Sequence, residues 1–129
     1  MVRIIRPQER DKGTTQTPGM QREAAISAGL TGSTGLWMGV GMNAPGAASG
    51  AHHHGASESG IYVLKGRLRF RWGDRLEHFA DASAGDFVFV PPWEVHTEEN
   101  LDAREPAEFL LARNTMEAVV VNVPDPRGL

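Results

Sequence analysis

The sequence predicts an all-β protein folded as an antiparallel sandwich or barrel. Short segments with the alternating pattern of a strand follow one another, turn signals separate them, and no segment has a convincing amphipathic helical pattern. The chain has 129 residues, 15 of them glycine and 8 proline, which is typical of a turn-rich globular fold. A chain of this length is expected to form a single domain over residues 1–129.

The strand predictions rest on alternation within each segment. Leu36, Met38, Val40 and Met42 fall on one side of a strand, because side chains two apart face the same way. Residues 20–28 suit either a helix or an edge strand, and the strand is favoured because glycines follow so closely. The remaining strands are expected at 61–64, 67–72, 76–79, 86–90, from His96 onward, at 107–112 and at 118–123.

Charge and residue usage narrow the classes of function. Thirteen basic and sixteen acidic side chains give a net charge of −3, which argues against nucleic acid as a partner. The sequence has no cysteine, so disulfides and metal–thiolate sites are excluded and any metal must be bound through nitrogen and oxygen. No apolar run approaches the roughly 20 residues that span a bilayer, and the N-terminal residues lack a signal-peptide pattern. A cytoplasmic protein without a membrane partner is therefore expected.

The segment GAHHHGASESG, residues 50–60, contains three of the five histidines of the chain and one acid. On a strand, His52 and His54 face the same way, so both can point into the interior of a barrel. A solvated polar loop is the simpler interpretation of this segment taken alone. Neutral imidazole suits Mn, Fe, Co, Ni, Cu and Zn, and a carboxylate such as Glu58 would complete a set with open positions for water or substrate.

Two motifs make the sequence resemble the cupins. The first motif, over residues 46–66, is matched by Gly46, His52, His54, Glu58 and Gly66. The second, over residues 85–100, is matched by Gly85, Pro91, His96 and Asn100. The resemblance implies a jelly-roll barrel, also described as an antiparallel double-stranded β-helix. It also implies one divalent transition metal, Fe, Mn, Ni, Cu or Zn, bound by His52, His54, Glu58 and His96.

The spacing of the first motif leaves its acid ligand open. One residue more than usual follows Glu58 before the closing glycine, so Ser59 takes the strand position of the usual acid. A bulge near Ser59 and Gly60 would return Glu58 to the metal. Two alternatives remain at this point: His53 binds in place of His54, or three histidines bind the metal with Glu58 outside the ligand set.

Residues near the predicted ligands are candidates for a substrate pocket. If His96 faces inward, Glu98 and Asn100 do so by the same alternation and can hold a histidine tautomer or a metal-bound water. Glu98 is the nearest proton carrier. Trp93 stands where the second motif usually has glycine, which predicts a different turn or an aromatic lid. The predicted pocket comprises Tyr62, Phe70, Trp93, Glu98 and Asn100, although plain core packing is the commoner role of such aromatic residues.

The resemblance implies a metal-dependent enzyme, because cupins include dioxygenases, isomerases, decarboxylases and epimerases. Dioxygenase- or isomerase-type chemistry on a small organic molecule is expected, with the metal or its water performing most of the reaction. An arginine such as Arg113 can meet an anionic substrate if its strand face points inward. The alternative is a non-catalytic module that binds a small molecule or a metal. Small cupins often pair through sheet edges, so a homodimer is expected.

Overall fold

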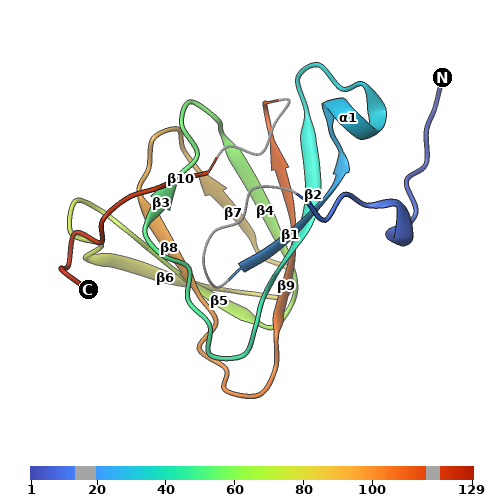
Figure 1. Cartoon of the computed structure of the whole chain (residues 1–129). Coiled ribbons are helices and arrows are strands. Elements are labelled where there is room, and N and C mark those ends of the chain that lie inside the picture. Colours follow the sequence, from blue (N-terminus) through green and yellow to red (C-terminus); the bar gives the residue numbers. More distant parts are fainter. Residues whose placement is uncertain (14–19, 116–119) are drawn as a thin grey trace.

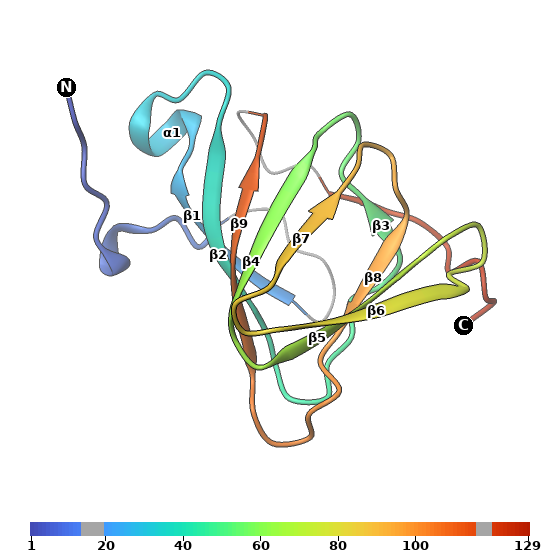
Figure 2. The same ribbon diagram turned by 180° about the vertical axis from the view of Figure 1, so that it is seen from behind.

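Two five-stranded antiparallel sheets face each other in the computed structural model and enclose the interior of a barrel (Figures 1 and 2). The structure describes residues 1–13, 20–115 and 120–129. The first sheet contains, in spatial order, β1 (Met20–Ile26), β2 (Trp37–Asn43), β9 (Ala107–Arg113), β4 (Ser59–Lys65) and β7 (Phe87–Val90). The second contains β10 (Val121–Asn122), β3 (His52–His53), β8 (His96–Glu99), β5 (Arg67–Trp72) and β6 (His78–Ser83). The predicted all-β antiparallel fold is confirmed.

The chain crosses repeatedly between the two sheets, which places strands that are distant in sequence side by side. In the first sheet β9 lies between β2 and β4, and in the second β8 lies between β3 and β5. The strand β7 forms one edge of the first sheet, and β6 forms one edge of the second. One side of the barrel is therefore bordered by two strand edges, those of β6 and β7 (Figure 2).

The helical segments are short and lie outside the barrel. The favoured strand at residues 20–28 is present as β1, and the helix α1 (Ala28–Thr31) follows it. Ser27 caps α1 by accepting a hydrogen bond from the Leu30 amide, and Gly32 ends the helix with a left-handed φ of 70°. A 3₁₀ turn, η1 (Pro7–Glu9), precedes β1. No helix among the described residues is both long enough and apolar enough to cross a bilayer.

Most predicted strands differ from the structure by one or two residues at their ends, and two of them differ by more. The strand expected at 76–79 begins only at His78, because Leu76 has a φ of 54° and its amide donates to the Gly73 carbonyl in a turn. The strand expected at 118–123 is described only as β10, and residues 118 and 119 lie outside the described part of the chain. The first difference shows that a left-handed residue can end a strand within an otherwise alternating segment.

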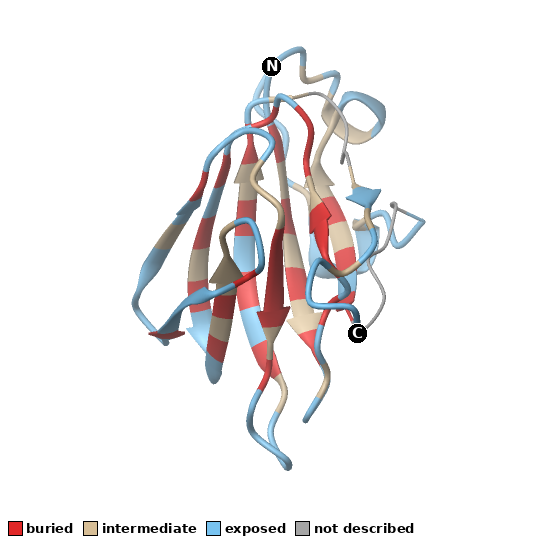
Figure 3. Cartoon of the chain, turned by 90° about the vertical axis from the view of Figure 1, so that its left-hand side faces the viewer, coloured by how far each residue is buried: buried red, intermediate tan, exposed pale blue. Residues whose placement is uncertain are grey.

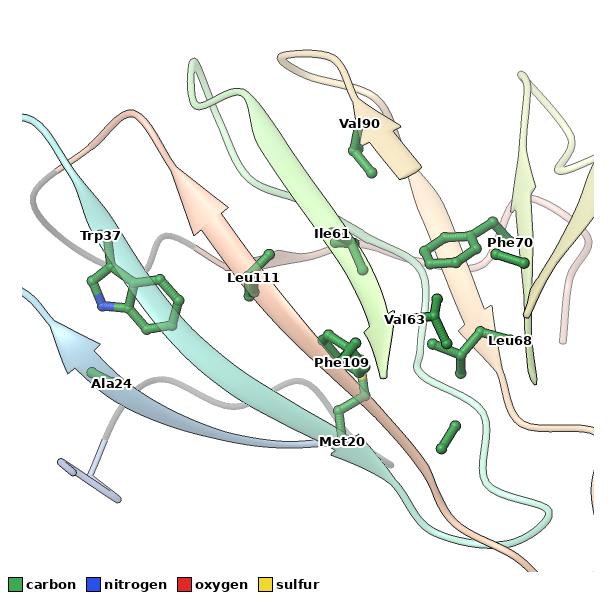
Figure 4. Close-up of a cluster of buried hydrophobic side chains, with 12 residues drawn as sticks. Met20, Ala24, Trp37, Ile61, Val63, Leu68, Phe70, Val90, Phe109 and Leu111 are labelled. Atoms are coloured by element: carbon green, nitrogen blue, oxygen red, sulfur yellow. The ribbon is translucent and has the colours of Figure 1, made fainter. Parts of the chain in front are cut away.

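The hydrophobic core is formed by the inward side chains of both sheets. Buried and exposed residues alternate along the strands, which appears as bands in Figure 3. Leu68 and Phe70 on β5 belong to this core together with Phe109 and Leu111 on β9 (Figure 4). A Cβ atom at Gly41 would collide with the Phe109 ring, so only glycine lets this ring pack directly against β2. Polar and charged side chains occupy the rest of the interior.

Candidate metal centre

Two neighbouring strands of the second sheet bring the predicted histidines together. The strands β3 and β8 are paired with His52 directly opposite His96. His54 follows β3, and Glu98 lies two residues beyond His96, where alternation returns its side chain to the interior. Among the described residues, these four form a buried group that could hold a metal ion. The motifs at 52–54 and 96 thus converge on one point inside the barrel.

The geometry of the cluster suits a single ion. The ligand atoms of His52, His54, His96 and Glu98 all lie within 4.8 Å of one another. Ligands about 2.0–2.2 Å from one ion are separated by up to about 4.4 Å when they lie on opposite sides of it. The four side chains therefore lie close enough to surround one ion after small adjustments of their positions.

The hydrogen bonds of two histidines orient their free nitrogens toward the centre of the cluster. His52 Nδ1 lies 2.8 Å from the Gly50 carbonyl and His96 Nδ1 lies 2.9 Å from the Glu94 carbonyl. A carbonyl only accepts hydrogen bonds, so both Nδ1 atoms carry the proton and Nε2 is left for a metal. Among the described residues, neither His52 Nε2 nor Glu98 Oε2 has a hydrogen-bond partner. These buried orphan atoms fit a bound cation.

The carboxylate of Glu98 is the negative centre of this group. Glu98 Oε1 lies 3.3 Å from His96 Nε2 and 3.9 Å from His52 Nε2. Burial raises the pKa of Glu98, but in the metal-free protein the hydrogen bond from His96, when that ring carries a proton on Nε2 as well as on Nδ1, and the nearby positive charges, that of Arg22 among them, outweigh burial and lower the pKa to about 2. The carboxylate therefore stays ionised at neutral pH, as a metal ligand must be.

His52 is held in the neutral form. Burial is the main reason that its pKa is lowered to about 4, and the positive charge of His96 lowers it further, against the opposing effect of Glu98. A neutral imidazole is the form that binds a transition metal. His52 is thus ready to act as a ligand well below the pH at which an ordinary histidine becomes protonated.

The metal-free protein is expected to lose stability as the pH falls from 6.5 to about 4. The pKa of His52 is 6.5 when unperturbed and about 4 in the folded protein, so the unfolded chain binds the extra proton first and the free energy of unfolding decreases. Thermal denaturation across this range measures the slope. It should be shallower in His52→Gln and unchanged when the exposed His78 is replaced by glutamine; equal slopes in all three proteins would contradict the prediction.

The structure corrects the expected role of Glu58. Its side chain is exposed, its backbone amide donates to Asn114 Oδ1 at 2.9 Å, and Asn114 Nδ2 lies 3.4 Å from its carboxylate. Glu98 takes the place in the cluster that was expected for Glu58. The predicted bulge at Ser59 and Gly60 is absent, because β4 pairs regularly there with both β7 and β9.

The extra residue of the first motif is accommodated later in β4. Val63 pairs with Phe109 and Lys65 with Glu108, so Leu64 is the residue without a partner position. Ser59 keeps the inward position as a result, and Glu58 remains outside. His53 also lies outside the cluster: its Nδ1 accepts a hydrogen bond from the Gly55 amide at 3.0 Å.

The other residues predicted for the pocket have varied positions. Tyr62 lies on the outer face of the first sheet, where its ring is 4.7 Å from that of Phe87, because the inward positions of β4 belong to its neighbours. Trp93 is exposed, with a φ of 64°, and its ring lies 5.6 Å from that of His53. Asn100 is buried, but its Nδ2 donates to three backbone carbonyls and so holds loops together. Only Phe70 and Glu98 remain near the cluster.

A cavity opens beside the cluster, between β5, β6 and β7. It has a volume of about 450 Å³, and its lining includes His96 together with Phe70, Trp72, Val88, Val90 and Glu94. A small organic molecule fits a volume of this size. The cavity lies where the edges of β6 and β7 border the barrel, and among the four side chains of the cluster it reaches His96.

Two buried arginines share the interior with the cluster. Arg113, at the end of β9, is close to His54, with 3.4 Å between its Nη2 and Nε2 of the imidazole. Arg22, on β1, was missed by the sequence analysis. The signal was available once residues 20–28 are taken as a strand, because Met20, Arg22 and Ala24 then face inward together. The pKa of Arg22 is lowered by burial and raised by Glu98, which places its charge near the cluster.

Comparisons with known proteins agree with this architecture. A family model described as the cupin domain matches residues 40–113. The polyketide cyclase RemF from Streptomyces resistomycificus is similar in structure, with a TM-score of 0.76 and 20% identity over 98% of this chain and 91% of that chain. A search of curated proteins finds no match.

Two further solved structures share the fold with larger chains. A mutant of the oxalate decarboxylase OxdC from Bacillus subtilis has a TM-score of 0.73 and 23% identity over 86% of this chain and 30% of that chain. An oxalate oxidase has a TM-score of 0.71 and 20% identity over 88% of this chain and 60% of that chain. At such low sequence identity, the structural similarity shows a shared fold alone. Because the cupin model matches more than half of the sequence, this chain belongs to the cupin family.

Proposed function

We propose that this cupin is an enzyme that uses one divalent transition metal for dioxygenase- or isomerase-type chemistry on a small organic molecule. The observation that carries the proposal is the buried convergence of His52, His54, His96 and Glu98 beside a cavity of about 450 Å³ that reaches His96. A ligand set with a neighbouring substrate-sized space is the arrangement that metal catalysis requires.

The side chains of the cluster have distinct roles in this proposal. The three imidazoles and the Glu98 carboxylate would hold the ion, and the backbone carbonyls of Gly50 and Glu94 keep two of the rings in orientation. When bound, the metal would supply Lewis acidity and, if it is Fe, Mn, Ni or Cu, redox chemistry with dioxygen. The ligand type is compatible with each of these ions and with Zn.

The surrounding residues limit water and offer the substrate a hydrogen-bond acceptor. Apolar side chains of Phe70, Val88 and Val90 line the cavity next to His96 and limit the water that reaches the reacting atoms. Glu98 Oε2 is buried without a hydrogen-bond partner among the described residues, so it can accept a hydrogen bond from a substrate held in the interior. Glu98 is thus both a candidate ligand and a candidate hydrogen-bond acceptor for the substrate.

The named relatives support an enzyme of this size. RemF, a polyketide cyclase by its title, matches this chain over nearly the whole length of both proteins. The oxalate decarboxylase and oxalate oxidase are also enzymes, although this chain spans only 30% and 60% of their lengths. The likeness to RemF thus supports the proposal that a chain of this length with this fold is an enzyme.

The proposal is tested by metal analysis of the purified protein followed by activity assays. Oxygen consumption is measured with a panel of diketones, catechols, flavonols and small organic acids, and isomerisation of the same compounds is followed by NMR without oxygen. Turnover should disappear in His96→Ala and persist in His78→Ala, because His78 is exposed and belongs neither to the cluster nor to the lining of the cavity. Tight binding of a small molecule without turnover, with each of several reconstituted metals, would instead identify a non-catalytic binding module.

We also propose that the protein forms a homodimer through the outer face of the first sheet. Outward positions of β4, β7 and β9 carry the exposed side chains of Leu64, Phe87, Phe89 and Leu110. An exposed apolar face of this kind marks an interaction surface. Light scattering should give twice the 14.0 kDa mass of the chain, and Phe89→Lys should yield monomers. A monomeric parent protein would remove this proposal without affecting the metal site.

A further inference from the structure

Arg113 has a fixed position next to the cluster, although a guanidinium cannot bind a metal. Arg113 is buried and only 2% exposed. Its Nε donates to Ser59 Oγ at 3.1 Å, and its Cζ lies 5.4 Å from the centre of the Trp37 ring. Ser59 on β4 and Trp37 on β2 are the residues directly opposite Arg113 on its two neighbouring strands. The guanidinium is therefore held in place from both sides.

The outer edge of this guanidinium lacks acceptors. Among the described residues, Arg113 Nη1 has no hydrogen-bond partner although it is buried. Arg113 Nη2 lies 3.4 Å from His54 Nε2, a distance near the upper limit for a hydrogen bond. A ring nitrogen has one lone pair, so His54 Nε2 cannot serve both Arg113 and a metal ion. Two nitrogens of a buried cation are left with a weak acceptor or none, which is costly unless a further group binds there.

The charges around Arg113 favour an anion. Burial lowers its pKa to about 9, and the positive charge of Arg22 contributes, so it remains protonated at neutral pH. Glu98 is the one acid among the described residues that raises the pKa of either arginine. The same carboxylate belongs to the proposed ligand set. Two guanidinium groups and a divalent ion would then share a single negative charge.

We propose that Arg113 binds the carboxylate of the substrate, and that the substrate is a small organic acid. The edge formed by Nη1 and Nη2 of a guanidinium matches the two oxygens of a carboxylate in distance and charge. A water molecule would satisfy one of these N–H groups but would leave the positive charge uncompensated. Neutral diketones and catechols would also leave this positive charge uncompensated. This inference rests on the proposed function, since it assigns a substrate class to the same interior.

A matched pair of probes separates charge from shape. Benzoate and benzamide have nearly the same size, and only benzoate is an anion. Their affinities are measured by calorimetry with the full chain, in the metal-free and the Zn²⁺-loaded form, since Zn²⁺ adds no redox chemistry. Benzoate should bind at least about tenfold more tightly than benzamide in the metal-free protein, because a hydrogen-bonded charge pair contributes that much. Equal affinities would overturn the inference.

Variants assign the recognition to Arg113. The affinity for benzoate should fall about tenfold or more in Arg113→Gln and less in Arg113→Lys, which keeps the charge but loses the forked geometry. Arg67→Gln is the control, because Arg67 is exposed on β5. Benzoate binding that is unchanged in a folded Arg113→Gln protein would refute the assignment. If Arg113→Gln does not fold, Ser59→Ala, which removes the hydroxyl that positions Nε, should weaken benzoate binding, and an unchanged affinity there would refute it equally.

The two proposals fail separately in this design. A protein that prefers benzoate to benzamide without Zn²⁺, and that binds no metal, retains the anion site while the metal-dependent function is wrong. A protein that binds one Zn²⁺ but does not distinguish benzoate from benzamide retains the metal site, and the substrate is then not an acid held by Arg113. Zn²⁺ stoichiometry is measured by elemental analysis on the samples used for calorimetry.

Discussion

Replacing Glu98 by glutamine is expected to lower the affinity of the protein for Zn²⁺ by about 100-fold or more. Glutamine keeps the shape of the side chain but removes the one negative charge among the four groups of the cluster. It also leaves Arg22 and Arg113 without the carboxylate that offsets their charges, which further disfavours a cation in the interior. Competition with a chromophoric chelator measures the affinity, and circular dichroism verifies that the variant is folded.

The matched control for this experiment is Glu58→Gln. Glu58 is the acid of the first motif, but its side chain is exposed and its neighbour Ser59 occupies the inward position. We expect its Zn²⁺ affinity to equal that of the parent protein. A large loss in Glu58→Gln together with none in Glu98→Gln would return the acid ligand to position 58 and would require a different register for β4.

Replacing Phe109 by alanine is expected to lower the free energy of unfolding by about 3–5 kcal/mol. The ring is 1% exposed, lies in the core formed by both sheets, and fills the space over Gly41 (Figure 4). A loss of this size is a large fraction of the total stability of an ordinary domain, which is about 5–15 kcal/mol. Urea denaturation measures it, and Glu108→Ala, on the exposed face of the same strand, should change the stability by less than about 0.5 kcal/mol.

A double variant tests whether Gly41 and Phe109 form one packing unit. Gly41→Ala alone is expected to destabilise the protein, because the added Cβ collides with the Phe109 ring. In the Phe109→Ala background the same methyl group enters the space that the ring has left. The double variant should therefore lose less stability than the two single variants together. A loss equal to the sum of the two single losses would show that the two residues are not in contact.

Local alternation was enough to predict most strands and the histidine pair. The segment 67–72 was predicted with the bounds that β5 has in the structure, because its apolar and basic residues alternate without interruption. His52 and His54 were placed on one face by the same rule, and both lie in the cluster. A rule based on neighbouring residues succeeds wherever the strand is regular.

The identity of the acid in the cluster could not be predicted from any short segment of the sequence. The spacing after Glu58 shows one extra residue, but the position that absorbs it is decided by pairing with β9, which is about 50 residues later in the chain. The structure places it at Leu64 and leaves Glu58 outside. Glu98 was predicted to face inward with His96, yet only the opposition of His52 and His96 across two strands brings its carboxylate to the histidines.

Arg22 shows why the charged part of the interior was incompletely predicted. Alternation along β1 places Arg22 on the same face as Met20 and Ala24, but a charged residue is rarely buried, so this signal alone does not decide between the interior and the surface. Its burial depends on the charged groups that it meets in the interior, the negative Glu98 on β8 and the positive Arg113 on β9. Such groups become visible only when the sheets are assembled.

The position of Ser59 makes the interior sensitive to the length of the chain at one point. If Ser59 were deleted, Glu58 would precede Gly60 directly and would take the place opposite Arg113, while the rest of β4 kept its pairing. The new carboxylate would neutralise the guanidinium from within. The loss of a single codon would thus replace the proposed binding site for an organic acid by a counter-ion that belongs to the barrel itself, with no other side chain exchanged.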